Sequence, residues 1–207
     1  MSTVALHHVS IEEAVADIAA GRMVVILDEE GDAGDVVMAA ERVTPDAINF
    51  MARKVGGWVR LTLTCGRCSE LGIGLMASTE TAATVMPLAV TIEAAEGVTT
   101  GISTADQALT MRTAADPSKG HADLVVPGHV RPVMARDGGV LERPCPTEAA
   151  TDLARLAGFP PSAVVCGIQN FDGTMARIPE ALAYADRHEM KVISVAEMVA
   201  YRQARAQ

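Results

Sequence analysis

The sequence predicts an α+β fold in which helices cover a mixed sheet. Segments with strand-like and helix-like patterns alternate along the 207 residues, without internal repeats, linkers or low-complexity tracts. Hydrophobic residues make up 49% of the chain and aromatic residues only 3%, so the core is expected to be aliphatic. A chain of this length suits one domain, spanning residues 1–207.

Capping residues and short apolar runs predict the first elements. Ser10 and Glu13 have the spacing of a capping box, and the apolar-periodic stretch after them ends at Gly21, which predicts a helix. The run Met23–Leu27 is short and rich in β-branched residues, as in a buried strand. The acidic stretch Asp28–Asp35 that follows is expected to be a loop.

The same reasoning applies to the rest of the chain. Thr44 and Pro45 predict a helix that runs to about Lys54, and the alternating segment Trp58–Thr64 predicts a strand. The remaining expected elements are, in order, a strand at Leu88–Ala94, a helix from Ser103 to Ala115, a helix at Thr147–Leu156, a strand at Ala163–Ile168, a helix at Pro179–His188, a strand at Lys191–Val195 and a terminal helix capped by Ser194 and Glu197.

Charge and composition exclude several classes of partner. The formal net charge is −9 and no Lys/Arg cluster occurs, so neither a nucleic-acid partner nor an anionic membrane surface is expected. No targeting segment is visible, because the apolar run Met23–Leu27 is too short, and a cytoplasmic location is expected. The pair Cys65 and Cys68 has no further zinc ligands at the usual spacing, so we expect reduced structural thiols.

The most informative segment is Thr91–Asp106, which reads TIEAAEGVTTGISTAD. It closely resembles a segment of the 3,4-dihydroxy-2-butanone 4-phosphate synthase family. The resemblance continues in order through nearly the whole chain. The other matching segments are Pro127–Val130, Gly138–Leu141, Thr147–Ala149, Asp172–Arg177 and Val199–Arg202.

The resemblance implies a fold and a reaction. The implied fold is a three-layer α/β/α arrangement around a mixed, twisted sheet, and the implied assembly is a homodimer. The family's reaction converts ribulose 5-phosphate into 3,4-dihydroxy-2-butanone 4-phosphate and formate. Such chemistry uses a divalent metal that polarises hydroxyl and carbonyl oxygens, with acid–base groups that guide enolisation and rearrangement.

Three positions depart from the family's pattern. The acidic stretch Asp28–Asp35 is about two residues short and lacks the family's arginine–glutamate pair, which includes a metal ligand. Pro146 stands where the family has a metal-binding histidine, and Gly167 stands where it has a catalytic glutamate. Neither residue offers a side-chain lone pair. The substitutions predict that the family's metal ligand set is lost, with Glu29, Glu30 and Asp35 as the alternative ligands for a cation.

Other positions match the family and supply the candidate site. The expected catalytic residues are His129, Glu148 and Cys145, and the expected substrate-binding residues are Arg143, Thr147, Asp35, Arg60, Arg131 and Ser103. Arg143 and Thr147 match phosphate-binding positions, where an arginine fork and a hydroxyl near a helix N-terminus suit an anionic oxygen.

Each candidate also has a purely structural interpretation. Thr147 would then cap its helix, Cys145 would be a buried passive thiol and His129 a satisfied core residue. Arg60 and Arg131 would extend along the surface, although in the pocket their guanidinium groups could replace a lost cation.

Three hypotheses about function follow. The leading one is a repurposed, metal-independent enzyme of specialised biosynthesis, of lyase or isomerase type, which acts on a small enolisable phosphorylated or carboxylated substrate. The second is the family's own synthase of riboflavin biosynthesis. The third is an inactive homologue that binds a metabolite. No cofactor is expected under the first hypothesis, and magnesium only under the second.

Overall fold

Six strands form the central sheet, in the order β6-β3-β7-β2-β1-β8. The protein is described by a computed structural model that covers residues 8–76 and 87–205. Neighbouring strands are antiparallel except for two parallel pairs, β1 with β8 and β3 with β6, so the sheet is mixed. The strands of this sheet are β1 (Val24–Asp28), β2 (Ala33–Ala39), β3 (Gly56–Thr64), β6 (Pro132–Ala135), β7 (Ser162–Ile168) and β8 (Lys191–Ser194).

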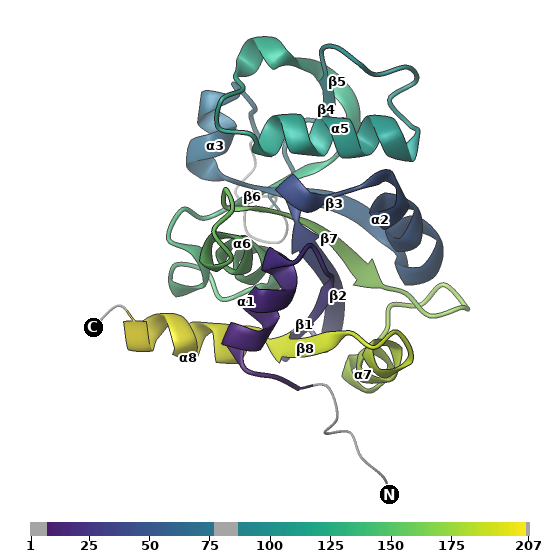
Figure 1. The fold of residues 1–207 in the computed structure, drawn as a ribbon, viewed down its shortest axis with the longest axis vertical. Helices are drawn as coiled ribbons and strands as arrows, with labels where there is room; N and C mark the ends of the chain where they lie inside the picture. The colour runs from purple at the N-terminus through teal and green to yellow at the C-terminus, as the bar shows by residue number, and fades with distance from the viewer. Residues whose placement is uncertain (1–7, 77–86, 206–207) are drawn as a thin grey trace, which may run out of the picture.

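Helices cover both faces of the sheet (Figure 1). They are α1 (Ile11–Ala19), α2 (Pro45–Phe50), α3 (Cys65–Glu70), α5 (Thr104–Ala115), α6 (Pro146–Leu156), α7 (Ile178–Arg187) and α8 (Val195–Arg205). One buried apolar cluster joins the sheet to α2, α3, α5 and α7, and a second joins its other face to α1, α6 and α8. Because side chains alternate along each strand, adjacent residues enter different clusters. The predicted three-layer α/β/α fold is confirmed.

A second, smaller sheet carries part of the candidate site. It pairs β4 (Ile92–Ala94) with β5 (Leu124–Val130) and packs against α5, as the upper part of Figure 1 shows. The pairing register shifts between Ile92, which faces Val130, and Glu93, which faces Val125. Residues 126–129 therefore bulge out of the pairing, and such bulges redirect side chains.

The expected caps are found where the sequence placed them. Ser10 and Glu13 form the capping box of α1, and the Thr44 hydroxyl accepts a hydrogen bond from the Ala47 amide at the start of α2. Ser194 and Glu197 likewise bond each other's backbone amides before α8. Local side-chain chemistry was sufficient to predict these helix starts.

The prediction of a loop from Asp28 to Asp35 was wrong. The chain turns within four residues and returns at Ala33 as β2, a central strand that pairs with β1 and β7. Glycine and aspartate are poor strand formers, but tertiary packing overrides that preference. Gly34 is needed because an added Cβ would lie 2.7 Å from the Cβ of Ala181 in α7. Asp35 consequently lies in a strand.

Other boundaries also differ from the sequence-based expectation. The expected strand at Leu88–Ala94 is paired as a strand only from Ile92, with isolated bridges at Leu88 and Ala89. After Phe50 the predicted helix continues as a π-helix, Met51–Val55. Short 3-10 helices lie at Ala40–Arg42, His121–Asp123 and Gly139–Leu141. No helix among the described residues has the length and apolar character needed to cross a bilayer.

Candidate active site

Glu148 organises the first turn of α6. Its side chain is fully buried, and its Oε1 accepts hydrogen bonds from Arg143 Nε at 2.8 Å and from the Arg136 amide at 2.9 Å. Arg143 Nη2 lies 2.6 Å from the same oxygen and also donates to the Met134 carbonyl. The expected residues Arg143 and Glu148 are thus brought together. Much of the arginine fork, however, is engaged within the protein.

Cys145 is the N-cap residue of α6, and its thiol donates to Glu148 Oε2 at 2.5 Å. Burial and the hydrogen bond to this carboxylate raise the pKa of Cys145. A raised pKa disfavours the thiolate, which is the nucleophilic form. The geometry therefore makes Cys145 a neutral hydrogen-bond donor to Glu148, which agrees with its purely structural interpretation.

Thr147 lies in the first turn of α6, and its side chain does not cap the helix because Cys145 occupies the N-cap position. One turn later, Thr151 donates to the Thr62 hydroxyl of β3 at 3.0 Å. This contact places α6 over the sheet face that also carries Arg60, two residues before Thr62 in β3. The expected substrate-binding residues Thr147 and Arg60 therefore share one face.

Arg60 and Asp35 form an ion pair across β7, with Nη2 and Oδ1 2.8 Å apart. Both side chains are nearly buried, with exposed fractions of 14% and 13%. Burial raises the pKa of Asp35, although the Arg60 charge opposes that rise. Gly167 pairs with Asp35 in β7, and the Met175 side chain packs over it, so that an added Cβ would lie 2.8 Å from Met175 Cε and 3.7 Å from Asp35 Oδ1.

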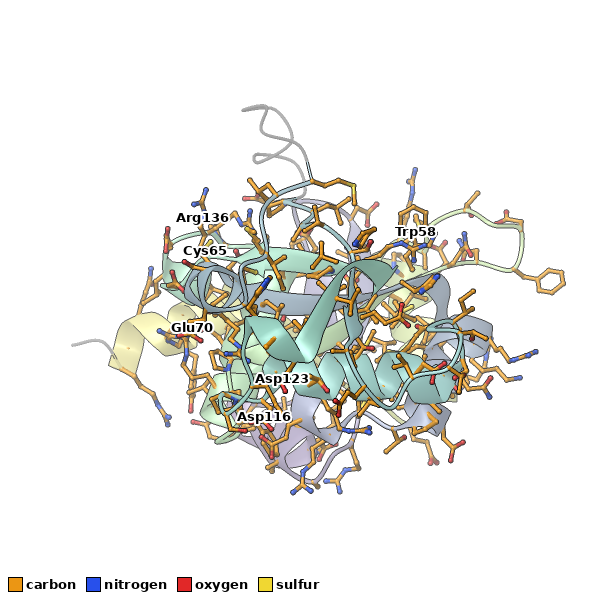
Figure 2. All side chains as sticks on the ribbon, turned by 90° about the horizontal axis from the view of Figure 1, so that it is seen from above. Trp58, Cys65, Glu70, Asp116, Asp123 and Arg136 are labelled. Carbon is orange, nitrogen blue, oxygen red and sulfur yellow. The ribbon has the colours of Figure 1, made fainter. Side chains whose placement is uncertain are left out.

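Arg131 contacts an exposed aromatic ring, and Ser103 caps a helix. The Arg131 guanidinium stacks over the ring of Trp58, 4.6 Å from its centroid, and Trp58 is 65% exposed. Trp58 lies on the side of the molecule away from Cys65 and Arg136 (Figure 2). Ser103 is the N-cap of α5, and its hydroxyl accepts from the Asp106 amide at 3.1 Å.

His129 meets a residue that the sequence analysis did not select. Its Nδ1 lies 2.7 Å from Oε2 of Glu93, which comes from β4. The side chain of Glu93 is 14% exposed and that of His129 48%. The sequence separation of 36 residues hides this pair. The only available signal was that both residues lie in segments that resemble the family.

The family model for 3,4-dihydroxy-2-butanone 4-phosphate synthase matches residues 12–201 of this chain. The chain belongs to this family. A 3,4-dihydroxy-2-butanone 4-phosphate synthase of Pseudomonas aeruginosa is 47% identical over 195 residues, which are 93% of this chain and 53% of that protein. The riboflavin biosynthesis protein RibBA of Aquifex aeolicus is 46% identical over 197 residues, 93% of this chain and 48% of that protein. The chain thus spans about half the length of these curated relatives.

Solved structures of 3,4-dihydroxy-2-butanone 4-phosphate synthases share the fold. RibBX, a two-domain synthase from A. baumannii, has a TM-score of 0.89 and 43% identity, covering 94% of this chain and 58% of that one. The synthase of Candida albicans has a TM-score of 0.87 and 33% identity, covering 95% and 98% of the two chains. A further synthase structure, a complex with two magnesium ions, has a TM-score of 0.87 and 32% identity, covering 95% and 97%.

These relatives correct the leading functional hypothesis. We expected a repurposed, metal-independent enzyme, but relatives 46–47% identical over 93% of the chain are named as synthases or as riboflavin biosynthesis proteins. That expectation was wrong, and the relatives favour the second hypothesis, the family's own synthase. The expectation that no cofactor is needed is not supported either, because a related synthase structure contains two magnesium ions.

The described acidic side chains lie in several separate places rather than in one metal-binding cluster. Magnesium takes oxygen ligands in near-octahedral geometry. Among residues 8–76 and 87–205, no group of three or more His, Cys, Asp or Glu side chains could hold a metal ion. Asp35 and Glu148 both face arginines. Asp28, Glu29 and Glu30 line a pocket of about 350 Å³ with Pro144 and the start of α8. The described residues thus offer no cluster of three such ligands, whereas magnesium is also held by one or two carboxylates together with waters and substrate oxygens.

Proposed function

We propose that this chain converts ribulose 5-phosphate into 3,4-dihydroxy-2-butanone 4-phosphate and formate, a lyase reaction of riboflavin biosynthesis. The observation that carries the proposal is 47% identity over 93% of the chain to a protein of that name. The atoms of ribulose 5-phosphate equal those of the product plus formic acid. The reaction therefore needs no oxidant, reductant or water.

The side chains on the α6 face and on β5 suit the steps of this reaction. Enolisation needs a base beside the substrate carbon, and the half-exposed imidazole of His129 can accept a proton. Negative charge then develops on the substrate oxygens, and Arg60, held in place by Asp35, supplies a fixed positive charge on the α6 face. Thr147, in the first turn of α6, presents a hydroxyl and backbone amides suited to the phosphate.

A homodimer belongs to the same proposal. Trp58, Phe171 and Met175 are exposed by 65%, 110% and 54%, which is a high exposure for large apolar side chains. Gly56 and Gly57 pack against Gln169 and Gly167, so the start of β3 lies beside the loop that carries Phe171. A second copy would cover this apolar surface.

The test is a continuous assay of formate release from ribulose 5-phosphate by the purified chain in magnesium-containing buffer. The proposal predicts turnover that follows enzyme concentration. Arg143→Lys should lower the rate about 10-fold or more, because lysine lacks the planar fork that holds both Glu148 and an anion. The matched control is Arg187→Lys, which makes the same change at an exposed position of α7. Formate release equal to that of a no-enzyme blank would reject the proposed function.

A further inference from the structure

Glu93 is built into the smaller sheet in a way that aims it at His129. The register shift between β4 and β5 lets residues 126–129 bulge, and Gly128 presses against the backbone of Ile92, where a Cβ would overlap. The bulge turns His129 so that its Nδ1 meets the Glu93 carboxylate at 2.7 Å. The fold, rather than a mobile side chain, determines this contact.

The far side of the Glu93 carboxylate is bounded by a fixed loop. Gly101 has a φ of +74°, and a Cβ at this position would overlap the Glu93 carboxylate. Asp106 holds the loop, because its carboxylate accepts hydrogen bonds from the backbone amides of Thr99, Thr100 and Gly101. Only glycine combines this backbone conformation with so close an approach. Glu93 is thus enclosed on the side opposite His129.

Only one of the two carboxylate oxygens of Glu93 has a hydrogen-bond partner among the described residues. Oε2 meets His129, whereas Oε1 is buried and has no hydrogen-bond partner among the described residues. A buried acceptor without a partner costs free energy, so a carboxylate retained only for stability would be expected to bond through both oxygens. An interaction directed at one imidazole nitrogen is typical of a carboxylate that orients a histidine.

We propose that Glu93 is the positioning residue for His129 in the reaction. Its carboxylate accepts a hydrogen bond from Nδ1–H, so the neutral ring presents the Nε2 lone pair toward the half-exposed side. Nε2 takes a proton from the carbon beside the substrate carbonyl, the C–H electron pair forms the C=C bond, and the carbonyl electron pair moves onto oxygen to give an enediolate. The resulting imidazolium is stabilised by the Glu93 charge and returns the proton from Nε2 to the enediolate oxygen, which gives the neutral enediol. This inference rests on the proposed function for its substrate.

The kinetic test compares Glu93→Gln, Glu93→Asp and the matched control Glu96→Gln, which removes one charge from an exposed position three residues away. Glu93→Gln should lower kcat for formate release about 100-fold, the scale of general base catalysis, and change KM less than about 3-fold. Glu93→Asp should recover part of that loss, and the control should match the wild type. An unchanged kcat, or a loss confined to KM, would overturn the proposal.

A double-variant comparison separates positioning from any other effect. In a His129→Gln background, Glu93→Gln should cause little further loss of kcat, because residues that act as one unit are not additive. A loss of similar size in both backgrounds would show that Glu93 acts independently of His129.

A second readout needs no turnover. Nitrogen-15 NMR of the His129 ring reports which nitrogen carries the proton in the neutral form. The wild type should show protonated Nδ1, and Glu93→Gln should change that tautomer population. If the wild type releases no formate but shows this tautomer, the proposed function fails and the positioning stands. A ring protonated on Nε2, or one insensitive to Glu93→Gln, would refute the positioning role.

Discussion

At the scale of single residues, Glu148 shows how a predicted catalytic group can have a structural task. Its carboxylate is buried and receives hydrogen bonds from Arg143, Cys145 and the Arg136 amide. Burial would lower the pKa of Arg143, but the hydrogen bond and charge of Glu148 outweigh burial and raise it. The pair therefore holds the loop before α6 to the first turn of that helix.

Glu148→Gln should destabilise the protein by about 3 kcal/mol, because it leaves Arg143 partly buried without its counter-charge. Urea unfolding measures the difference, and Glu41→Gln, at an exposed position, serves as the matched control. If Glu148→Gln lowers the free energy of unfolding by less than about 1 kcal/mol, as expected for the exposed control, Glu148 is not needed for stability.

The sequence suggested individual candidate residues, but it did not predict which residues they contact. Arg143, Thr147 and Arg60 were selected as substrate-binding residues, and that role stays a prediction; their protein partners were not foreseen. Asp35 meets Arg60 across an intervening strand, and Glu93 meets His129 across a bulge. Both pairs depend on sheet register, which one sequence does not specify.

At the scale of elements, the loop before α5 depends on Asp106. Burial disfavours its charged form, but hydrogen bonds from Thr99 and Ser103 outweigh this effect and lower the pKa of Asp106 below its usual range. A carboxyl with a depressed folded-state pKa stabilises the fold above its unfolded value, and that stability is lost as the pH falls through the folded value. The loop should therefore loosen only in acid.

Amide hydrogen exchange of Thr99, Thr100 and Gly101 tests this expectation. After correction for intrinsic exchange rates, protection of these amides should be constant from pH 7 to pH 5. It should be lost only in stronger acid, where protonation of Asp106 removes the acceptor. Asp106→Asn should show weak protection at every pH. Protection in the variant equal to that of the wild type would mean that another group holds the loop.

Helix starts were predictable because capping residues act locally, as Ser10, Thr44 and Ser194 show. Strand β2 was missed because Gly34 and Asp35 have low strand propensity. Its place between β1 and β7 is set instead by packing against α7.

At the scale of the whole molecule, the proposed dimer explains the apolar side chains exposed near β3. Light scattering should give twice the chain mass of 21.6 kDa at micromolar concentration. A double variant, Trp58→Ser with Phe171→Ser, should shift the protein toward the monomer. Leu141→Ser, on the 3-10 helix before α6, is the control. A wild-type monomer would contradict the proposed assembly.

The fold class was predictable at this scale, and the function was not. Interleaved elements and the resemblance around Thr91–Asp106 were sufficient to predict the layers. The substitutions at Pro146 and Gly167 suggested a new activity, but relatives identical at nearly half of all positions retain the synthase name. Three local changes in one sequence therefore do not by themselves establish a new activity.

The most direct measurement follows uniformly carbon-13-labelled ribulose 5-phosphate by NMR after addition of the purified chain in magnesium-containing buffer. The proposed function predicts equal amounts of two labelled products, formate and a four-carbon phosphorylated ketone, at a rate proportional to enzyme. Persistence of the substrate signals, or a five-carbon isomer formed without formate, would contradict it.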